Sequence, residues 1–171
     1  MTARRATLDD LDAIMRIERH SFPADAWSEA MMREDIASPH THYLVVEEAG
    51  RLIGYGGLRA PQGSSDADIQ TIALAAGSRG TGRGRMLLRE LIAEAAARGV
   101  HELFLDVRDD NEPAQALYVS EGFQSLGRRP KYYQPEGVDA IVMRLDVPGW
   151  AAARGSATGS STGADTAGVC T

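Results

Sequence analysis

The sequence predicts one α/β domain built around a mixed sheet. Segments with the two-residue alternation of strands and segments with helical periodicity follow one another in the order strand, two helices, three strands, helix, strand, helix, two strands. The chain has 171 residues, 43% of them apolar, which is enough to fill one core. We expect the folded domain to span residues 1–146, because the composition changes beyond it.

Two helices are expected near the N-terminus. Thr7 and Asp10 form a capping-box pattern at the start of the first helix, and apolar residues recur at helical spacing between Leu11 and His20. Ser28 is a suitable N-cap for the second helix, which we expect to run through Glu34.

Three strands follow. Residues 43–47 and 52–58 have strand-like composition, and Ala49-Gly50 between them favours a hairpin turn. A polar loop at residues 59–66 separates this hairpin from residues 68–74, which form the third strand candidate.

The second half of the domain alternates helix and strand. A glycine-rich stretch leads into a helix with a clear apolar face, and Gly99 ends it. Gly122 ends the next helix in the same way. The remaining expected elements are a strand at 102–107, that helix at 112–121, and strands at 123–132 and 139–145.

The C-terminal segment has a different composition. From Gly149 onward it consists mainly of Gly, Ser, Thr and Ala, with almost no large apolar residue after Trp150. Such a segment buries too little surface to offset the entropy of ordering it. Residues 147–171 are therefore predicted to be a disordered tail.

Charge and cysteine content narrow the function classes. The net charge of −6 and the pI near 5.2 argue against nucleic-acid binding, which needs a field of Lys and Arg. A single cysteine, Cys170, indicates a reducing compartment. Neither a signal-peptide pattern nor a membrane-span pattern is visible, so we expect a cytoplasmic protein without a membrane partner. A monomer is the favoured oligomeric state. The four histidines lack metal-ligand spacing, so no metal is expected.

The stretch Arg79-Gly80-Thr81-Gly82-Arg83-Gly84 lies between a predicted strand and a predicted helix. Its glycines let the backbone turn tightly, and the helix that follows adds unpaired N–H groups, so together they suit a phosphate. A Walker loop would end in Gly-Lys-Ser/Thr, which is missing here. A dinucleotide fingerprint would need glycine where Leu87 stands. The pattern Q/R-x-x-G-x-G/A, which binds the acetyl-CoA pyrophosphate in the GNAT superfamily, matches.

Three longer blocks make this resemblance specific. QTIALAAGSRGTGRGRMLLRELI, LFLDVRDDNEPAQALYVSEGF and RRPKYYQPEGVDAIVM together are similar to the ribosomal-protein-alanine N-acetyltransferases (RimI-like) of the GNAT superfamily, in particular those of actinobacteria. The resemblance covers about residues 1–146. It implies a mostly antiparallel GNAT sheet flanked by helices, with acetyl-CoA as co-substrate in a splay between the central strands. The residues that it implies for acetyl-CoA binding are Ile72, Ala73, Leu74, Arg79, Gly80, Thr81, Gly82, Arg83, Gly84, Arg85 and Asn111.

Asp106 is the candidate general base. It is a carboxylate in the middle of the apolar strand LFLDV, where such a group needs an explanation. The family carries glutamate at this position in the pattern LEVR, so the shorter aspartate calls for a water relay or for a base from elsewhere. A structural carboxylate, bonded to backbone or to Arg108, is the alternative interpretation.

Tyr118 is the candidate general acid. The resemblance places the tyrosine of the ALY motif near the CoA sulfur, and a phenol with an ordinary pKa near 10 is protonated at neutral pH. Core packing is the alternative. Asn111 is also a suitable helix N-cap, and that role is compatible with cofactor contact. Tyr132 and Tyr133 resemble the family's R-x-x-Y-Y segment near the acceptor, although alternating strand aromatics can also serve packing.

Three functions stay open at this point. The first is direct acetyl transfer, with general base and general acid help, to the free α-amine of a protein N-terminus; the family precedent is the N-terminal alanine of a ribosomal protein. An α-amine pKa of about 7.7–8.0, against about 10.4 for lysine, leaves more free base. The second is acetylation of a small-molecule amine or a lysine side chain. The third is a CoA-binding module without turnover.

Overall fold

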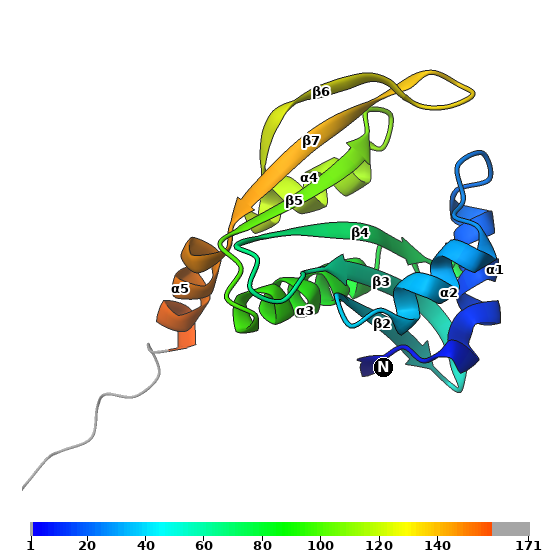
Figure 1. Cartoon of the computed structure of the whole chain (residues 1–171), viewed down its shortest axis with the longest axis horizontal. Helices are drawn as coiled ribbons and strands as arrows, with labels where there is room; N and C mark the ends of the chain where they lie inside the picture. Colours follow the sequence, from blue (N-terminus) through cyan, green and yellow to red (C-terminus); the bar gives the residue numbers. More distant parts are fainter. Residues whose placement is uncertain (1, 159–171) are drawn as a thin grey trace, which may run out of the picture.

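The computed structural model describes residues 2–158 and shows one sheet with helices on both of its faces (Figure 1). The strands are β1 (Thr2–Arg5), β2 (Thr41–Glu48), β3 (Arg51–Arg59), β4 (Asp66–Leu74), β5 (Glu102–Arg108), β6 (Gln124–Tyr133) and β7 (Val138–Asp146). The α-helices are α1 (Leu11–Ser21), α2 (Glu29–Ala37), α3 (Arg83–Ala97), α4 (Glu112–Glu121) and α5 (Val147–Thr158). Short 3-10 turns at Leu8–Asp10 and Ala76–Ser78 precede α1 and α3.

The sheet is mixed and mostly antiparallel, as predicted. Its strand order is β1-β2-β3-β4-β5-β7-β6, and β4 with β5 is the parallel pair. The remaining neighbours are antiparallel. The parallel pair needs a crossover, and α3 supplies it. This places the glycine-rich loop at the carboxyl end of β4, the strand that neighbours β5 with Asp106 in the sheet order.

The helices divide the core into two apolar clusters, one on each face of the sheet. Residues of α1 pack with Tyr43, Val45 and Tyr55 on one face, where Met32 of α2 joins them. The α3 residues Leu87, Leu88, Leu91 and Ile92 pack on the opposite face, and α4 contributes partly buried residues to that second cluster. The predicted apolar faces of the first and third helices are therefore the buried ones.

The helix caps and the hairpin turn lie where the sequence predicts them. The Thr7 amide donates to the Asp10 carboxylate at 2.8 Å, and the Ser28 hydroxyl accepts from the Met31 amide at 3.2 Å. The hairpin between β2 and β3 turns through Ala49 and Gly50 with positive φ angles of 50° and 73°.

The prediction of disorder from residue 147 is wrong for residues 147–158. These residues form α5, and the side chain of Val147 is 1% exposed. The Trp150 indole donates to the Glu121 carboxylate at 3.2 Å, which fixes α5 to α4. The two large side chains at the start of the segment therefore anchor a helix that its small residues can continue, since alanine favours helix. The rest of the predicted tail, with Cys170, lies outside the described residues.

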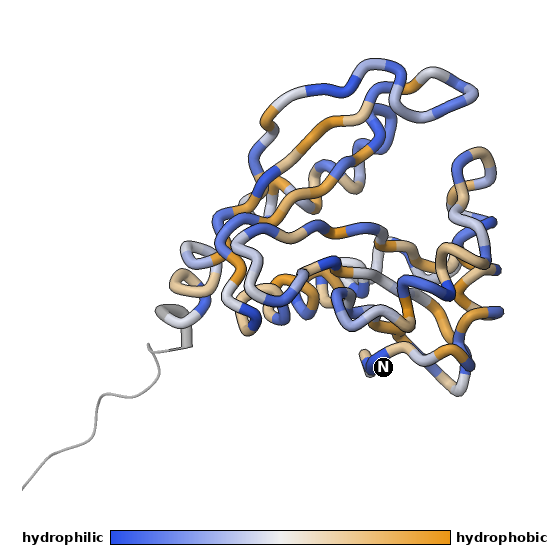
Figure 2. Tube along the Cα trace, in the orientation of Figure 1, coloured by the Kyte–Doolittle hydropathy of each residue, from blue (hydrophilic) through white to orange (hydrophobic). Residues whose placement is uncertain are grey.

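Strand β6 forms an edge of the sheet and is exposed along nearly its whole length. It is mostly hydrophilic, whereas the neighbouring β7 is largely hydrophobic (Figure 2). Tyr132 and Tyr133 stand at its end, next to the turn that leads into β7. The sheet edge therefore presents these tyrosines rather than burying them in a core cluster.

Candidate active site

Strands β4 and β5 are paired at one end only. Within the described chain their pairing covers Asp66–Asp68 against Glu102–Phe104. Beyond it, β4 continues to pair with β3, and β5 with β7. A bulge opposite the step from Gly57 to Leu58 interrupts the β3–β4 ladder just beyond this point. The strands therefore separate toward the side of α1 and leave backbone edges without a strand partner (Figure 1).

Three cavities follow one another through this separation. The glycine-loop cavity, about 510 Å³, lies between residues 72–74 and the glycine-rich loop. The central cavity, about 380 Å³, contains Asp106 and Tyr118 in its wall. The tyrosine cavity, about 400 Å³, is lined by Tyr132 and Tyr133 together with Asp106.

Shared walls connect the cavities into one path. Tyr118, Ile72 and Asn111 line both the glycine-loop cavity and the central cavity. Trp27, Asp106 and the two tyrosines line both the central cavity and the tyrosine cavity. Tyr118 belongs to the core cluster on the α3 face, and Trp27 to the one on the α1 face. The path therefore passes through the sheet between β4 and β5.

The glycine-rich loop has the conformation that its sequence predicts. Gly80 and Gly82 have positive φ angles of 72° and 80°, which side-chain-bearing residues rarely adopt. The Met86 amide donates to the Gly82 carbonyl at 3.1 Å as the first helical bond of α3. The amides of Gly84 and Arg85 come before it, and as donors of the first helical turn they have no acceptor within the helix. These donors and the helix dipole suit an anionic group.

The loop arginines are held by other residues. Arg79 donates to the Leu74 carbonyl at 3.3 Å, and Arg85 lies 2.7 Å from the Glu121 carboxylate. Both still line the glycine-loop cavity. Arg83 instead pairs with Glu48 at 2.5 Å. Of the residues predicted to bind acetyl-CoA, all except Thr81 and Arg83 line this cavity; their binding roles stay predictions.

Asp106 lies in the wall between the central cavity and the tyrosine cavity. Its side chain is 29% exposed, and its Oδ1 atom lies 3.5 Å from Nε of Arg129 on β6. Asp68 lines the tyrosine cavity with it. Burial, and then the negative charge of Asp106, raise the pKa of the Asp68 carboxyl. The tyrosine cavity therefore holds two carboxylates, those of Asp68 and Asp106, beside the guanidinium groups of Arg59 and Arg129.

Tyr118 stands where the glycine-loop cavity meets the central cavity. Its ring packs edge-on against Phe123, with the centroids 5.8 Å apart. Burial raises the pKa of the Tyr118 phenol to about 12, so the phenol keeps its proton at neutral pH. The nearby Asn111 is the N-cap of α4, where its side chain accepts from the Ala114 amide at 3.3 Å. The predicted cap is confirmed, and Asn111 also faces both cavities.

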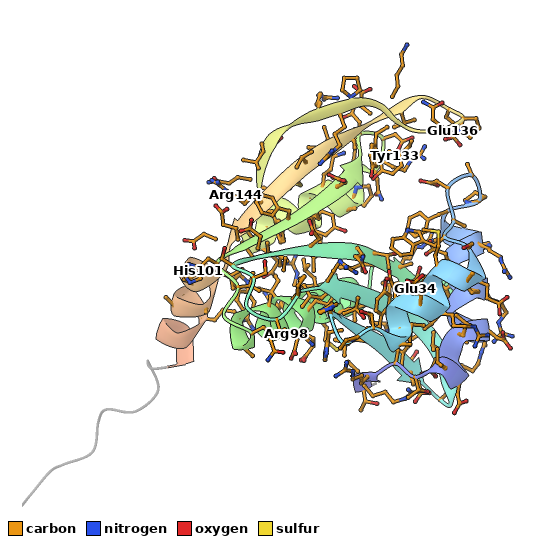
Figure 3. All side chains as sticks on the ribbon, in the orientation of Figure 1. Glu34, Arg98, His101, Tyr133, Glu136 and Arg144 are labelled. Carbon is orange, nitrogen blue, oxygen red and sulfur yellow. The ribbon has the colours of Figure 1, made fainter. Side chains whose placement is uncertain are left out.

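Arg108 on β5 connects the loop after α1 with the β6–β7 turn. It lies 3.7 Å from Asp25 in the loop after α1, and 3.5 Å from Glu136 in the β6–β7 turn. Its guanidinium also lies 5.2 Å from the centroid of the Tyr133 ring. Tyr133 and Glu136 stand at the hairpin end that faces the loop after α1 (Figure 3). The Tyr132 and Tyr133 rings meet edge-on at 5.1 Å, so the two aromatics form one wall.

Sequence reasoning missed Glu18, which lines the central cavity from α1 and is 1% exposed. Its carboxylate accepts from the Trp27 amide at 3.0 Å and from the Tyr55 hydroxyl. A signal was available, because Glu18 continues the helical spacing of Leu11, Ile14 and Met15, so a charge falls on the buried face.

Two kinds of feature are absent from residues 2–158. No group of three or more His, Cys, Asp or Glu side chains there could hold a metal ion. None of the helices in that range is both long enough and apolar enough to span a membrane.

Comparisons with known proteins agree with this geometry. The Acetyltransferase (GNAT) family model matches residues 11–123. The N-alpha-acetyltransferase RimI of Mycobacterium tuberculosis is 38% identical over 151 residues, covering 85% of this chain and 92% of that protein. A Bacillus subtilis protein described as a putative [ribosomal protein bS18]-alanine N-acetyltransferase is 36% identical, covering 84% of this chain and 94% of that protein.

A solved structure gives the same picture in three dimensions. The crystal structure of the ribosomal-protein-S18-alanine N-acetyltransferase from Escherichia coli matches with a TM-score of 0.76 and 31% identity. The match covers 85% of this chain and 93% of that chain.

Proposed function

Because the chain belongs to the GNAT family of acetyltransferases, we propose that it transfers acetyl from acetyl-CoA to the free α-amine of a protein N-terminus. The N-terminal alanine of a ribosomal protein is the first candidate acceptor, because the relatives described above carry that substrate in their names. The observation that carries the proposal is the single path through the sheet, with a phosphate-suited loop at one end and carboxylates and tyrosines at the other.

The glycine-loop cavity fits the CoA moiety. The amides at the start of α3 suit the pyrophosphate, and the unpaired edge of β4 at residues 72–74 suits the amide groups of the pantetheine arm. Acetyl-CoA supplies the activated acetyl group when it is bound. Backbone N–H groups of that β4 edge are the candidate donors to the oxygen that becomes negative during transfer.

Tyr118 is the proposed general acid. It stands where the glycine-loop cavity opens into the central cavity, which is where a CoA sulfur would end. The raised pKa keeps the phenol proton in place until a thiolate develops beside it.

Asp106 is the proposed general base. It faces the path from the side opposite the glycine loop, so an amine between the two cavities would lie between base and acid. An ammonium with a pKa of about 7.7–8.0 loses its proton readily near neutral pH. Asp106 accepts that proton directly or through a water molecule, since the aspartate arm is short.

The tyrosine cavity is the proposed acceptor site. Asp68 and Asp106 line it beside Arg59 and Arg129, and the carboxylates of Asp25 and Asp106 line the adjoining central cavity, where they favour a cationic amine. Tyr132 and Tyr133 offer a wall against which an extended peptide can pack. A ribosomal acceptor would place the reaction in the cytoplasm.

The test is an intact-mass assay of peptides incubated with acetyl-CoA and the protein. The panel presents free N-terminal Ala, Ser, Gly and Met, together with an N-terminally blocked peptide that contains lysine. We expect a gain of one acetyl group on the free α-amines alone. Modification of the blocked lysine peptide alone would support the lysine alternative, and modification of none of the peptides would support the small-molecule or the non-catalytic alternative.

A further inference from the structure

Glu18 is a buried carboxylate that the proposed chemistry does not use. It occupies the sheet-facing side of α1, among the apolar residues of the α1-face core, and is 1% exposed. Burying a carboxylate is costly unless hydrogen bonds compensate for the lost water. Here burial raises the pKa of the Glu18 carboxyl, and the hydrogen bond from the Trp27 amide opposes this with a weaker, lowering effect. A carboxylate at this position therefore needs hydrogen-bond donors.

Those partners come from two separate parts of the fold. The Oε1 atom accepts from the Trp27 amide at 3.0 Å, nine residues further along the chain. The Oε2 atom accepts from the hydroxyl of Tyr55, a fully buried residue of β3. That hydroxyl lies 3.4 Å from the Thr71 hydroxyl on β4. The carboxylate thus joins α1 and the chain at Trp27 to the strands beside the central cavity.

Glu18 also holds both ends of one loop. We call residues 22–28, between α1 and α2, the acceptor loop. The Phe22 amide at its start donates to the main-chain carbonyl of Glu18 at 2.8 Å. The Trp27 amide near its end donates to the side chain of the same residue. One residue therefore closes the loop at two points.

The acceptor loop supplies walls to the path. Phe22, Asp25 and Trp27 all line the central cavity, and Trp27 alone of the three lines the tyrosine cavity. Phe22, at the start of the loop, also lines the glycine-loop cavity, whereas Trp27 does not. Loss of the hydrogen bond between Trp27 and Glu18 should consequently disturb the tyrosine cavity more than the glycine-loop cavity.

We infer that Glu18 is a positioning residue for acceptor binding: its carboxylate fixes the acceptor loop against β3 and so places Trp27 in the wall of the tyrosine cavity. The inference rests on the proposed function only for the identity of the acceptor. The placement of Trp27 can be measured without any acceptor.

Two variants separate the role of the hydrogen bonds from that of the charge. Glu18→Met keeps the side-chain volume but accepts no bond from Trp27 or Tyr55. Glu18→Gln removes the charge, yet its carbonyl can accept from the Trp27 amide while its amide donates to the Tyr55 oxygen. Both are made in a Trp150→Phe background, which leaves Trp27 as the one tryptophan of the chain.

We expect Glu18→Met to change the KM for the acceptor peptide but not the KM for acetyl-CoA. Glu18→Met should raise the KM for the acceptor peptide at least tenfold, keep the KM for acetyl-CoA within twofold, and make Trp27 fluorescence more sensitive to acrylamide quenching. Glu18→Gln should stay within threefold of the background protein in every readout. The quenching arm needs no acceptor, so a wrong acceptor assignment and a wrong loop assignment give different results.

Other outcomes would overturn the inference. Unchanged acceptor KM and unchanged quenching in Glu18→Met would remove the positioning role. Loss of kcat in Glu18→Gln as large as in Glu18→Met, with Trp27 undisturbed, would make the carboxylate a proton acceptor instead. If Glu18→Met does not fold, hydrogen exchange of the Trp27 amide in the unaltered protein decides: protection supports the bond, and exchange at the rate of an unstructured peptide overturns it.

Discussion

The Nε atom of Arg129 lies 3.5 Å from the Oδ1 atom of Asp106, which ties the proposed base on β5 to the edge strand β6. Both side chains are partly exposed, at 56% and 29%, so the pair adds little to the stability of the fold. Its effect is on position, because it holds the carboxylate beside the strand that carries the two acceptor-side tyrosines. The positions of the proposed base on β5 and of the two tyrosines on β6 are therefore linked by this ion pair.

Replacing Asp106 with Asn should lower kcat by about 10²–10⁴-fold, the usual contribution of a general base. The KM for acetyl-CoA should stay within twofold, because Asp106 does not line the glycine-loop cavity. Steady-state kinetics with an acceptor peptide measures both values, and Asp106→Glu, which restores the family's residue, is the matched control. A kcat for Asp106→Asn within threefold of the unaltered protein would mean that Asp106 is structural.

The Tyr118→Phe variant should lower kcat about a hundredfold, because it removes the proposed proton donor and keeps the ring. Burial raises the pKa of this phenol to about 12, so the neutral form that can donate persists well above the ordinary value near 10. The unaltered protein should then show no loss of kcat from deprotonation of Tyr118 between pH 7 and pH 10. A pH–rate profile checks this; a fall in that range that disappears in Tyr118→Phe would contradict it.

At Gly82 the backbone φ angle of 80° makes a side chain costly, by roughly 1–2 kcal/mol. Gly82→Ala should shift the loop toward another conformation and raise the KM for acetyl-CoA about tenfold, while the acceptor KM stays within twofold. Gly77→Ala is the matched control, since an added Cβ there also meets open space and its φ is not positive. Equal effects of the two variants would argue against a loop that binds the cofactor.

The Glu121→Gln variant should lower the free energy of unfolding by about 2 kcal/mol at pH 7, because it weakens charge-assisted hydrogen bonds. Burial acts to raise the pKa of Glu121, but the hydrogen bonds from Arg85, Trp150 and Arg89 outweigh it and hold that pKa below its ordinary value. A lowered carboxyl pKa contributes stability above the ordinary value of about 4.3, and this is lost as the pH falls through the folded value. Urea unfolding of both proteins from pH 7 to pH 3 should show the difference shrink; a constant difference would refute the linkage.

Most of the fold was predictable because its signals are local. The capping box at Thr7, the N-cap at Ser28 and the helix stops at Gly99 and Gly122 each act within one turn of chain, and the apolar spacing assigned the buried faces. The helix α5 was missed for the opposite reason. It depends on the contact of Trp150 with Glu121, which is 29 residues away in sequence.

The site was predictable only where a motif marks it. The glycine loop, Asp106, Tyr118 and the two tyrosines line one path, and their chemical roles stay predictions. The pairing of Arg83 with Glu48 could not be foreseen, since it joins residues 35 apart with no pattern between them. Glu18 carried a signal, a charge on an apolar helix face, but its partners become visible only when the chain is folded.

The most direct test of the central claim uses one peptide with two competing amines: a free N-terminal alanine and an internal lysine. The peptide is incubated with acetyl-CoA and the protein near neutral pH, and fragmentation in the mass spectrometer locates the acetyl group. Acetylation of the α-amine, lost in Asp106→Asn, is the result that we predict. Acetylation of the lysine in preference to the α-amine would contradict the proposed function.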